Sequence, residues 1–410
     1  MVAIIAALAA TLLIRALPQY TLVTEVIASL FSDLPLHHLA LKVAFIFGTK
    51  LFGGFRYTLA RFAYYIDLLN VVASFAVFAW QFRGREKIED ELSKFGSNKI
   101  DIPDLASLQQ IKRMALPFIK NDGIILYPNI TYANREEALE AVKLTNDYDQ
   151  PRKMMLDVYA PAQKPPGLRP VLVHIHGGAW RHGNKNMVYP YENDLITEEK
   201  WIVVNIGYRL APVNAYPTHL KDVKRSLRWI KQCIDKFGGD PNFVVLAGDS
   251  AGGHLAMMAA MTANEARYQE GFEDVDTSVR GVVSLNGVLR THIDKFFARK
   301  VVMMKGPLDQ EFLQEHSPAT YCQKAHEKGN LVPSLVLVGQ CDNLVIPEGA
   351  REFTKQYRIA TGEEKGASSA CSYVEIPGGH HAFYAAWGAR SVYSAAIILS
   401  WCRELHNKNK

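Results

Sequence analysis

A single serine, Ser250, stands between glycines in the stretch GDSAG at 248–252, where an apolar run passes into an amphipathic one. The G-x-S-x-G spacing is typical of a nucleophile elbow, a sharp turn that exposes a serine hydroxyl and leaves no room for bulky neighbours. A helix that begins beside Ser250 would add partial positive charge and N–H groups near a reacting oxygen. A plain turn is the alternative interpretation, and the other loops of the chain decide between the two.

Two glycines follow an earlier apolar run, in the stretch HGGAW at 176–180. Backbone N–H groups of Gly177 and Gly178, together with that of Ala251, would form an oxyanion hole. Taken alone, the same glycines also fit an ordinary turn in which the histidine and tryptophan only pack. The residues that would support the two motifs are His176, Trp180, Gly248, Asp249 and Gly252.

An acid and a base follow two later runs. Asp342, in GQCD at 339–342, is the only acid at its predicted strand end, and Glu348 is a poorer candidate because it lies at the start of the next helix. The stretch PGGHHAF at 377–383 offers His380 or His381 as general base. The order serine, aspartate, histidine is that of α/β-hydrolases, in which the acid orients the imidazole that activates the serine.

Strands and helices must alternate to position these groups, and from about residue 124 the hydrophobic pattern predicts that they do. Continuous apolar runs of five or six residues suit strands buried on both faces of a mostly parallel sheet. Such a doubly wound α/β sheet places its ligand beyond the carboxyl ends of the strands, where all four motifs fall. The predicted strands are Ile124–Ile130, Met154–Tyr159, Val171–His176, Ile202–Ile206, Phe243–Ala247, Gly281–Leu285, Ser334–Val338 and Ser372–Ile376. The predicted helices are Leu220–Phe237, Gly252–Ala266, Pro347–Thr361 and Ala389–Glu404.

These motifs resemble the hormone-sensitive-lipase-like carboxylesterase branch of the α/β-hydrolase superfamily, and the whole set is similar to mycobacterial lipase/esterase-type proteins. The resemblance covers about residues 120 to 406 and implies an α/β-hydrolase fold, with a mostly parallel eight-stranded sheet flanked by helices. The motifs are HIHGGAWRHGNK, GYRLAP, KFGGDPNFVVLAGDSAGGHLAMMAAMTAN, GFEDVDTSV, VGQCDNLVIP and GGHHAF.

The resemblance also implies roles for single residues. Ser250 becomes the nucleophile and Asp342 the triad acid. His381 is favoured over His380, because the family's base is followed by any residue and then by phenylalanine, here Phe383. The resemblance implies that Gly177, Gly178 and Ala251 form the oxyanion hole. No metal and no organic cofactor is expected.

The chain departs from the family at two places. Asn343 and Leu344 follow the acid where a DPL run is frequent, and the N-terminal segment that often builds the lid looks membrane-directed. The resemblance therefore does not assign the residues of the lid and the acyl pocket. The stretch 286–305, with Arg290 and Phe297, could line that pocket, whereas Tyr208–Pro212 is expected to form a rigid turn.

The expected function is hydrolysis of a small or lipid-like ester through an acyl-enzyme. An arylformamidase-type amidase shares the H-G-G-x-W segment and the triad, and a prenylcysteine methylesterase fits similar motifs and a membrane location. A ligand receptor on an inactive hydrolase is the alternative from another class, but such receptors lose a triad member and this chain keeps all three.

The first ninety residues differ in composition, since acids are scarce and apolar residues dominate up to about Phe82. The run Phe62–Phe82 reaches the length of a bilayer span but contains Asp67 and Asn70, and Val2–Leu17 is the next best span. A signal peptide and soluble core helices are the alternatives. We expect residues 1–90 to form a helical membrane-associated segment, 91–120 a helical connector and 121–407 the catalytic domain.

The sequence does not decide on which side of the membrane the catalytic domain lies, because basic residues flank the best span at both ends. The expected location is an endomembrane such as the endoplasmic reticulum in a eukaryote, or the cell membrane in a bacterium. The sequon at Asn129 would matter only on a lumenal side.

Composition excludes other classes of protein. The 410 residues carry a net charge of +5 with basic and acidic residues interleaved, so no nucleic-acid-binding stripe is predicted. The five cysteines lie far apart and form no C-x-x-C pair, which disfavours a disulfide framework and a zinc site.

Overall fold

The computed structural model describes residues 25, 32–82, 84–93, 102–116, 123–363 and 370–409. The chain divides into two compact units, of which the first comprises Met1–Ile119, Gly339–Leu344 and Glu375–Ala396. The second comprises Lys120–Val338, Val345–Val374 and Ile397–Lys410. The apolar runs predicted within residues 2–17 and 23–31 lie outside the described residues, except for Glu25.

The second unit is built on an eight-stranded sheet in the order β1-β2-β4-β3-β5-β6-β7-β8. β2 runs antiparallel to both β1 and β4, whereas β4, β3, β5, β6 and β7 are parallel to one another. The predicted mostly parallel sheet is therefore confirmed. The strands are β1 (Ile124–Thr131), β2 (Met155–Pro161), β3 (Arg169–Ile175), β4 (Ile202–Ile206), β5 (Gly239–Asp249), β6 (Gly281–Leu285), β7 (Ser334–Gly339) and β8 (Cys371–Ile376).

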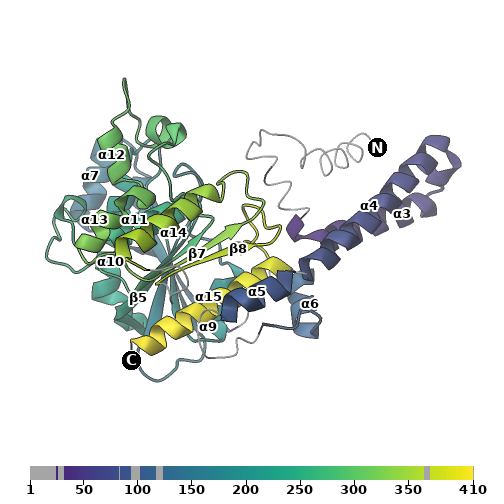
Figure 1. Ribbon diagram of the computed structural model, residues 1–410, viewed down its shortest axis with the longest axis horizontal. Coiled ribbons are helices and arrows are strands. Elements are labelled where there is room, and N and C mark those ends of the chain that lie inside the picture. Colours follow the sequence, from purple (N-terminus) through teal and green to yellow (C-terminus); the bar gives the residue numbers. More distant parts are fainter. Residues whose placement is uncertain are drawn as a thin grey trace. The chain divides into compact units, whose positions relative to one another are not determined.

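Helices cover the sheet on both faces, as buried parallel strands require. α10, α11, α13 and α14 pack side by side in this order on one face of the sheet, and α9 lies on the other face (Figure 1). The helices of this unit are α7 (Arg135–Thr145), α8 (Gln150–Lys153), α9 (Pro190–Thr197), α10 (Thr218–Cys233), α11 (Ala251–Met261), α12 (Gln310–Glu315), α13 (Pro318–Glu327) and α14 (Glu348–Thr361). The last helix, α15 (Ala389–Lys408), begins in the first unit and ends in the second.

The centre of the sheet is buried because its strands carry apolar side chains toward both helical layers. Every residue of β4 and of β6 is buried, and so is every residue of β7. α11 is buried along its whole length against β5 and β6, which places the residue between β5 and α11 at a fixed point of the fold. That residue is Ser250.

The first unit contains an α-helical hairpin formed by α3 (Pro35–Leu51) and α4 (Thr58–Phe82), which run side by side (Figure 1). Within α4, the stretch Arg61–Ala79 is long and apolar enough to cross a membrane, the one such helix among the residues that the structure describes. Two shorter helices follow, α5 (Gly84–Ser93) and α6 (Leu108–Ala115).

Candidate active site

The turn between β5 and α11 holds Ser250 in a conformation that few residues adopt. Its backbone angles are φ 52° and ψ −118°, outside the regions favoured by L-residues. A side chain at Gly248 would collide with the backbone of Gly252, and one at Gly252 would collide with the Ile175 carbonyl oxygen of β3. The glycines therefore let the backbone close tightly around the serine, as an elbow requires.

The turn after β3 is joined directly to this elbow. The N–H of Gly177 donates to Oδ1 of Asp249 at 3.0 Å. Within the described chain the N–H groups of Gly178 and Ala251 donate to no protein acceptor. Gly178 has a φ of 110°, which favours glycine. Of the three residues predicted to form the oxyanion hole, Gly177 would first have to give up its hydrogen bond to Asp249.

Residues 176–180 are here called the oxyanion turn, after their predicted role. His176 and Trp180 fix its two ends. The His176 ring stacks on Tyr208 at 4.4 Å between centroids, and the Tyr208 hydroxyl donates to the His176 carbonyl oxygen at 2.8 Å. Burial lowers the pKa of His176 to about 4, so the ring is neutral at physiological pH. Trp180 is buried, and its indole N–H donates to Nδ1 of His254 at 3.3 Å. Both residues are therefore structural supports.

A buried group of charges lies beneath the elbow. The His174 ring stands between Asp249 and Glu192, with its nitrogens 3.2 Å and 3.3 Å from their oxygens. Burial lowers the pKa of His174, but the two carboxylates outweigh burial and raise it. The sequence analysis missed His174 and Glu192, although a histidine inside the apolar run of β3 was a visible signal.

The predicted acid and the predicted base belong to the first unit and lie together within it. Nδ1 of His381 is 2.7 Å from Oδ2 of Asp342, which is buried. The other oxygen of Asp342 accepts the Leu344 N–H at 2.9 Å, which fixes the carboxylate. A buried aspartate at Nδ1 leaves Nε2 of the imidazole to exchange a proton with a reacting group. Ser250 belongs to the second unit.

His380 has a different partner, which the sequence analysis did not anticipate. Its Nδ1 lies 3.2 Å from Oε1 of Glu25, and the same oxygen accepts the His381 backbone N–H at 3.0 Å. The only signal for Glu25 in the sequence was its position as a carboxylate interrupting an apolar run.

Two other residues weighed in the sequence analysis have partners of their own. Arg290 forms an ion pair with Glu352 at 3.0 Å, and Glu348 starts α14 and pairs with Arg351 at 3.1 Å. Phe297 is fully buried with its ring centroid 5.0 Å from that of Trp180, so it packs behind the oxyanion turn.

The stretch Tyr208–Pro212 serves the fold, as its sequence suggested. Nε and Nη2 of Arg209 donate to the two oxygens of Asp222 at 2.8 Å and 2.7 Å, and both side chains are buried. This bidentate pair fixes the end of β4 to α10.

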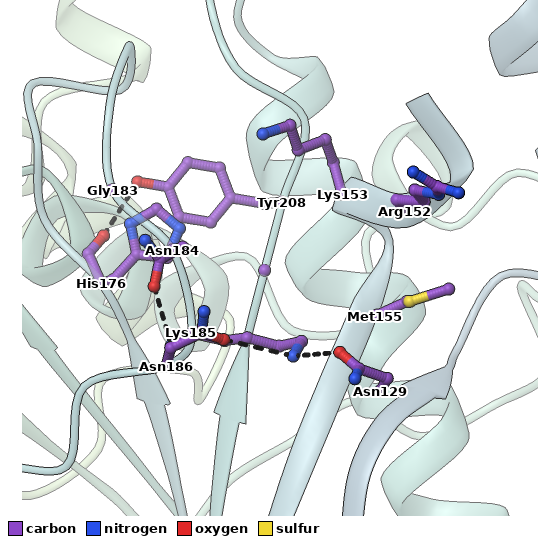
Figure 2. Close-up of a pocket in the computed structure, with 11 residues that line it drawn as sticks. Asn129, Arg152, Lys153, Met155, His176, Gly183, Asn184, Lys185, Asn186 and Tyr208 are labelled. Atoms are coloured by element: carbon purple, nitrogen blue, oxygen red, sulfur yellow. Dashed lines mark hydrogen bonds between the residues drawn. The ribbon is translucent and has the colours of Figure 1, made fainter. Parts of the chain in front are cut away.

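A pocket of about 420 Å³ lies beside the turn after β3, with His176 in its wall (Figure 2). Nζ of Lys185 donates to Oδ1 of Asn129 and to Oδ1 of Asp157, each at 2.7 Å. Asn129, the asparagine of the sequon, therefore lines this pocket. The lining residues are Asn129, Arg152, Lys153, Met155, His176, Gly183, Asn184, Lys185, Asn186, Gly207 and Tyr208.

Comparisons with known proteins find similar sequences and similar folds. A family model described as BD-FAE matches residues 156–357. The probable carboxylic ester hydrolase LipM of Mycobacterium tuberculosis is 36% identical over 250 residues, which cover 58% of this chain and 55% of LipM. The esterase LipQ of the same organism is 34% identical over 289 residues, which cover 68% of this chain and 66% of LipQ. The match thus spans between half and two thirds of the length of these relatives.

Among solved structures, esterase B from Lactobacillus rhamnosis superposes with a TM-score of 0.57 at 19% identity, covering 81% of this chain and 98% of that chain. At this identity the likeness concerns the fold alone. The sheet order, the elbow and the relatives lead to one conclusion: the chain has an α/β-hydrolase fold and is similar in sequence to these mycobacterial carboxylesterases.

Proposed function

We propose that this protein is a serine carboxylic-ester hydrolase that acts through an acyl-enzyme. The observation that carries the proposal is the strained backbone of Ser250, in the turn between the end of β5 and the start of α11. Gly248 and Gly252 stand on either side of it, at positions where a side chain would collide with the backbone. Backbone strain of this kind persists where the surrounding structure enforces it, and it is concentrated at functional sites. The Asp342–His381 pair supports the same chemistry.

In the proposed mechanism, Ser250 attacks the ester carbonyl carbon while Nε2 of His381 takes the hydroxyl proton. Asp342 holds the imidazole in the tautomer with its proton on Nδ1 and stabilises the imidazolium that forms. The imidazolium then protonates the leaving alcohol, and a water molecule, activated in the same way, releases the acid.

The tetrahedral intermediate carries a negative oxygen that needs N–H donors. Gly178 and Ala251 have donors that are not used within the described chain, and we assign them this role. Gly177 is the third proposed donor and would exchange its hydrogen bond to Asp249 for one to the oxyanion. Losing one such donor typically costs about 10²–10³ in rate.

A fluorophosphonate probe tests the nucleophile directly. We expect labelling of the wild-type protein at Ser250, shown by mass spectrometry of the labelled peptide, and no labelling or turnover in Ser250→Ala. A Ser250→Ala protein that keeps most of its esterase rate would exclude the proposal. Aryl esters of graded acyl length, compared with N-formyl aromatic amides, would separate an esterase from the amidase alternative.

We also infer that the protein is attached to a membrane through the α3–α4 hairpin, because polar groups lie inside the hairpin and apolar ones outside. Nζ of Lys42 pairs with Asp67 at 2.6 Å between the helices, and Asn70 is buried. A hairpin surrounded by water has the opposite arrangement. The exposed apolar side chains are Leu41, Val43, Phe45, Phe47, Leu51, Phe52, Leu59, Phe62, Tyr65, Leu68, Leu69, Val72 and Phe75.

Extraction of membranes from cells that express the full chain tests the attachment. We expect the protein to resist alkaline carbonate and to enter a detergent phase. Leu41 and Leu69 are each 70% exposed, so Leu41→Glu and Leu69→Glu place a charge in lipid and should reduce recovery in the membrane fraction. Leu139→Glu, at a residue of α7 that is 61% exposed, is the matched control and should change nothing. Release of the wild-type protein by carbonate would refute this inference.

A further inference from the structure

The turn that carries the proposed base, residues 377–381, is here called the base turn. It follows the end of β8 and is held by side chains from several parts of the first unit. Nε of Arg390 donates to the Pro377 carbonyl oxygen at 3.0 Å, and the Gly378 N–H donates to Oε1 of Gln340 at 3.2 Å. At its far end, the His381 N–H donates to Oε1 of Glu25 at 3.0 Å.

Residues before α3 complete the support of the base turn through Arg390. Nη1 of Arg390 donates to Oδ1 of Asp33 at 2.6 Å and to the Ser32 hydroxyl oxygen at 2.7 Å. Both members of the ion pair are buried, and the Gln81 side chain in α4 donates to the Ser32 carbonyl oxygen. A buried pair of this kind is rigid, because separating it would leave an uncompensated charge.

Glu25 contacts both histidines of the base turn. It is 1% exposed, and one carboxylate oxygen serves both His380 and the His381 backbone while Oε2 has no hydrogen-bond partner in the described chain. Burial raises the pKa of Glu25, but the hydrogen bonds and charges of His380 and His381 outweigh burial and lower it. The buried group is therefore an anion at neutral pH, and it is kept so by the base turn.

Two carboxylates of the first unit lie next to His381. Asp342 contacts its imidazole ring, and Glu25 contacts its backbone N–H and the ring of His380. Asp33 and Arg390 form a neutral pair behind them. When the imidazole takes up a proton, the Asp342 carboxylate at its ring and the nearby Glu25 carboxylate at its backbone favour the charged form.

We propose that Glu25 is a positioning residue for catalysis: its carboxylate holds the base turn in place and supplies a second negative charge beside His381. A residue that precedes the α3–α4 hairpin in the chain then helps to position the base. This inference rests on the proposed function, since it concerns how the base of that reaction is held.

Two substitutions separate the two effects of the carboxylate. Glu25→Gln keeps an oxygen that accepts the His381 N–H but removes the charge, whereas Glu25→Ala removes both. Glu86→Gln is the matched control, because Glu86 is an exposed carboxylate in α5 of the same unit. The full chain is assayed in detergent micelles with a soluble p-nitrophenyl ester, and kcat and KM are measured from pH 5 to 9.

Glu25→Ala should lower kcat about 10-fold or more with little change in KM, because a misplaced base slows the reaction more than it weakens substrate binding. Glu25→Gln should lower kcat less, and the acid limb of its kcat/KM profile should move to lower pH by at least a few tenths of a unit, because imidazolium loses a stabilising charge. A merely structural role would not move the profile. Unchanged profiles and rates in both variants would overturn the proposal.

Hydrogen exchange gives a readout that does not need activity. The peptide that contains the base turn should exchange faster in Glu25→Ala than in the wild-type protein and in Glu86→Gln, since the His381 amide loses its acceptor. If the wild-type protein neither turns over an ester nor labels at Ser250, the proposed function fails, and the exchange rate alone decides whether Glu25 holds the turn. Equal exchange in the three proteins would overturn that part as well.

Discussion

The backbone N–H of Gly177 donates to the Asp249 carboxylate at 3.0 Å, and this bond joins the turn after β3 to the elbow after β5. Asp249 is itself held by His174, which lies between it and Glu192. The residue before the proposed nucleophile thus links it to the turn that carries the proposed oxyanion donors.

Gly177→Ala should therefore reduce activity while the protein still folds. A methyl group at this position would collide with the Asp249 carboxylate and lie 3.0 Å from Cβ of Ser250. We expect kcat to fall about 10²-fold, the cost of a displaced oxyanion donor. Steady-state kinetics measures this fall, and a thermal unfolding midpoint within a few degrees of the wild type would show that the fold is kept. Full activity in Gly177→Ala would mean that the contact has no catalytic importance.

Asp342→Asn should leave the base turn intact and almost abolish turnover. An amide facing Nδ1 of His381 favours the wrong tautomer and does not stabilise the imidazolium, which costs about 10⁴ in kcat in enzymes of this type. Glu348→Gln serves as control, because that carboxylate pairs with Arg351 at the start of α14. If Glu348→Gln lost the activity and Asp342→Asn retained it, the acid would be wrongly assigned.

Acid should destabilise the second unit through its buried histidines. Burial lowers the pKa of His254 to about 3, well below the value of an unfolded chain. The unfolded state then binds more protons between about pH 6.5 and pH 3, so the free energy of unfolding falls as the pH drops through that window. His254→Gln should make this dependence shallower, whereas the exposed His326, replaced in the same way, should not. Denaturant titrations at several pH values measure the slope, and equal slopes in all three proteins would contradict the assignment.

Removing one member of the buried Lys42–Asp67 ion pair should destabilise the protein more than replacing both members. Lys42→Met alone leaves the Asp67 carboxylate unpaired inside the hairpin and should cost about 3–5 kcal/mol of stability. The double variant Lys42→Met/Asp67→Leu should recover most of the loss, because two apolar side chains replace two charges. Thermal unfolding in micelles compares the three proteins. A double variant no more stable than the single one would show that the pair is needed for another reason.

The sequence alone determined the strands and four of the helices, because the periods of apolar residues are local properties. The runs that became β4 and β6 were predicted to the residue, since both are short apolar runs that are buried on both faces, whereas α7, α9 and α13 were not predicted. β5 proved longer than predicted, because Gly239 at its start pairs with Arg169 of β3, a contact that the local pattern does not reveal. The four motif positions also followed from the sequence, since chain order and strand ends place them.

The tertiary structure decided which charges meet. Glu25 contacts the His381 amide from 356 positions away, and nothing in the local sequence names that partner. The same holds for His174 with Glu192 and for Lys42 with Asp67, whose members lie far apart in the sequence. A buried charge is stable only beside its counterpart, and only the folded chain determines where that counterpart lies.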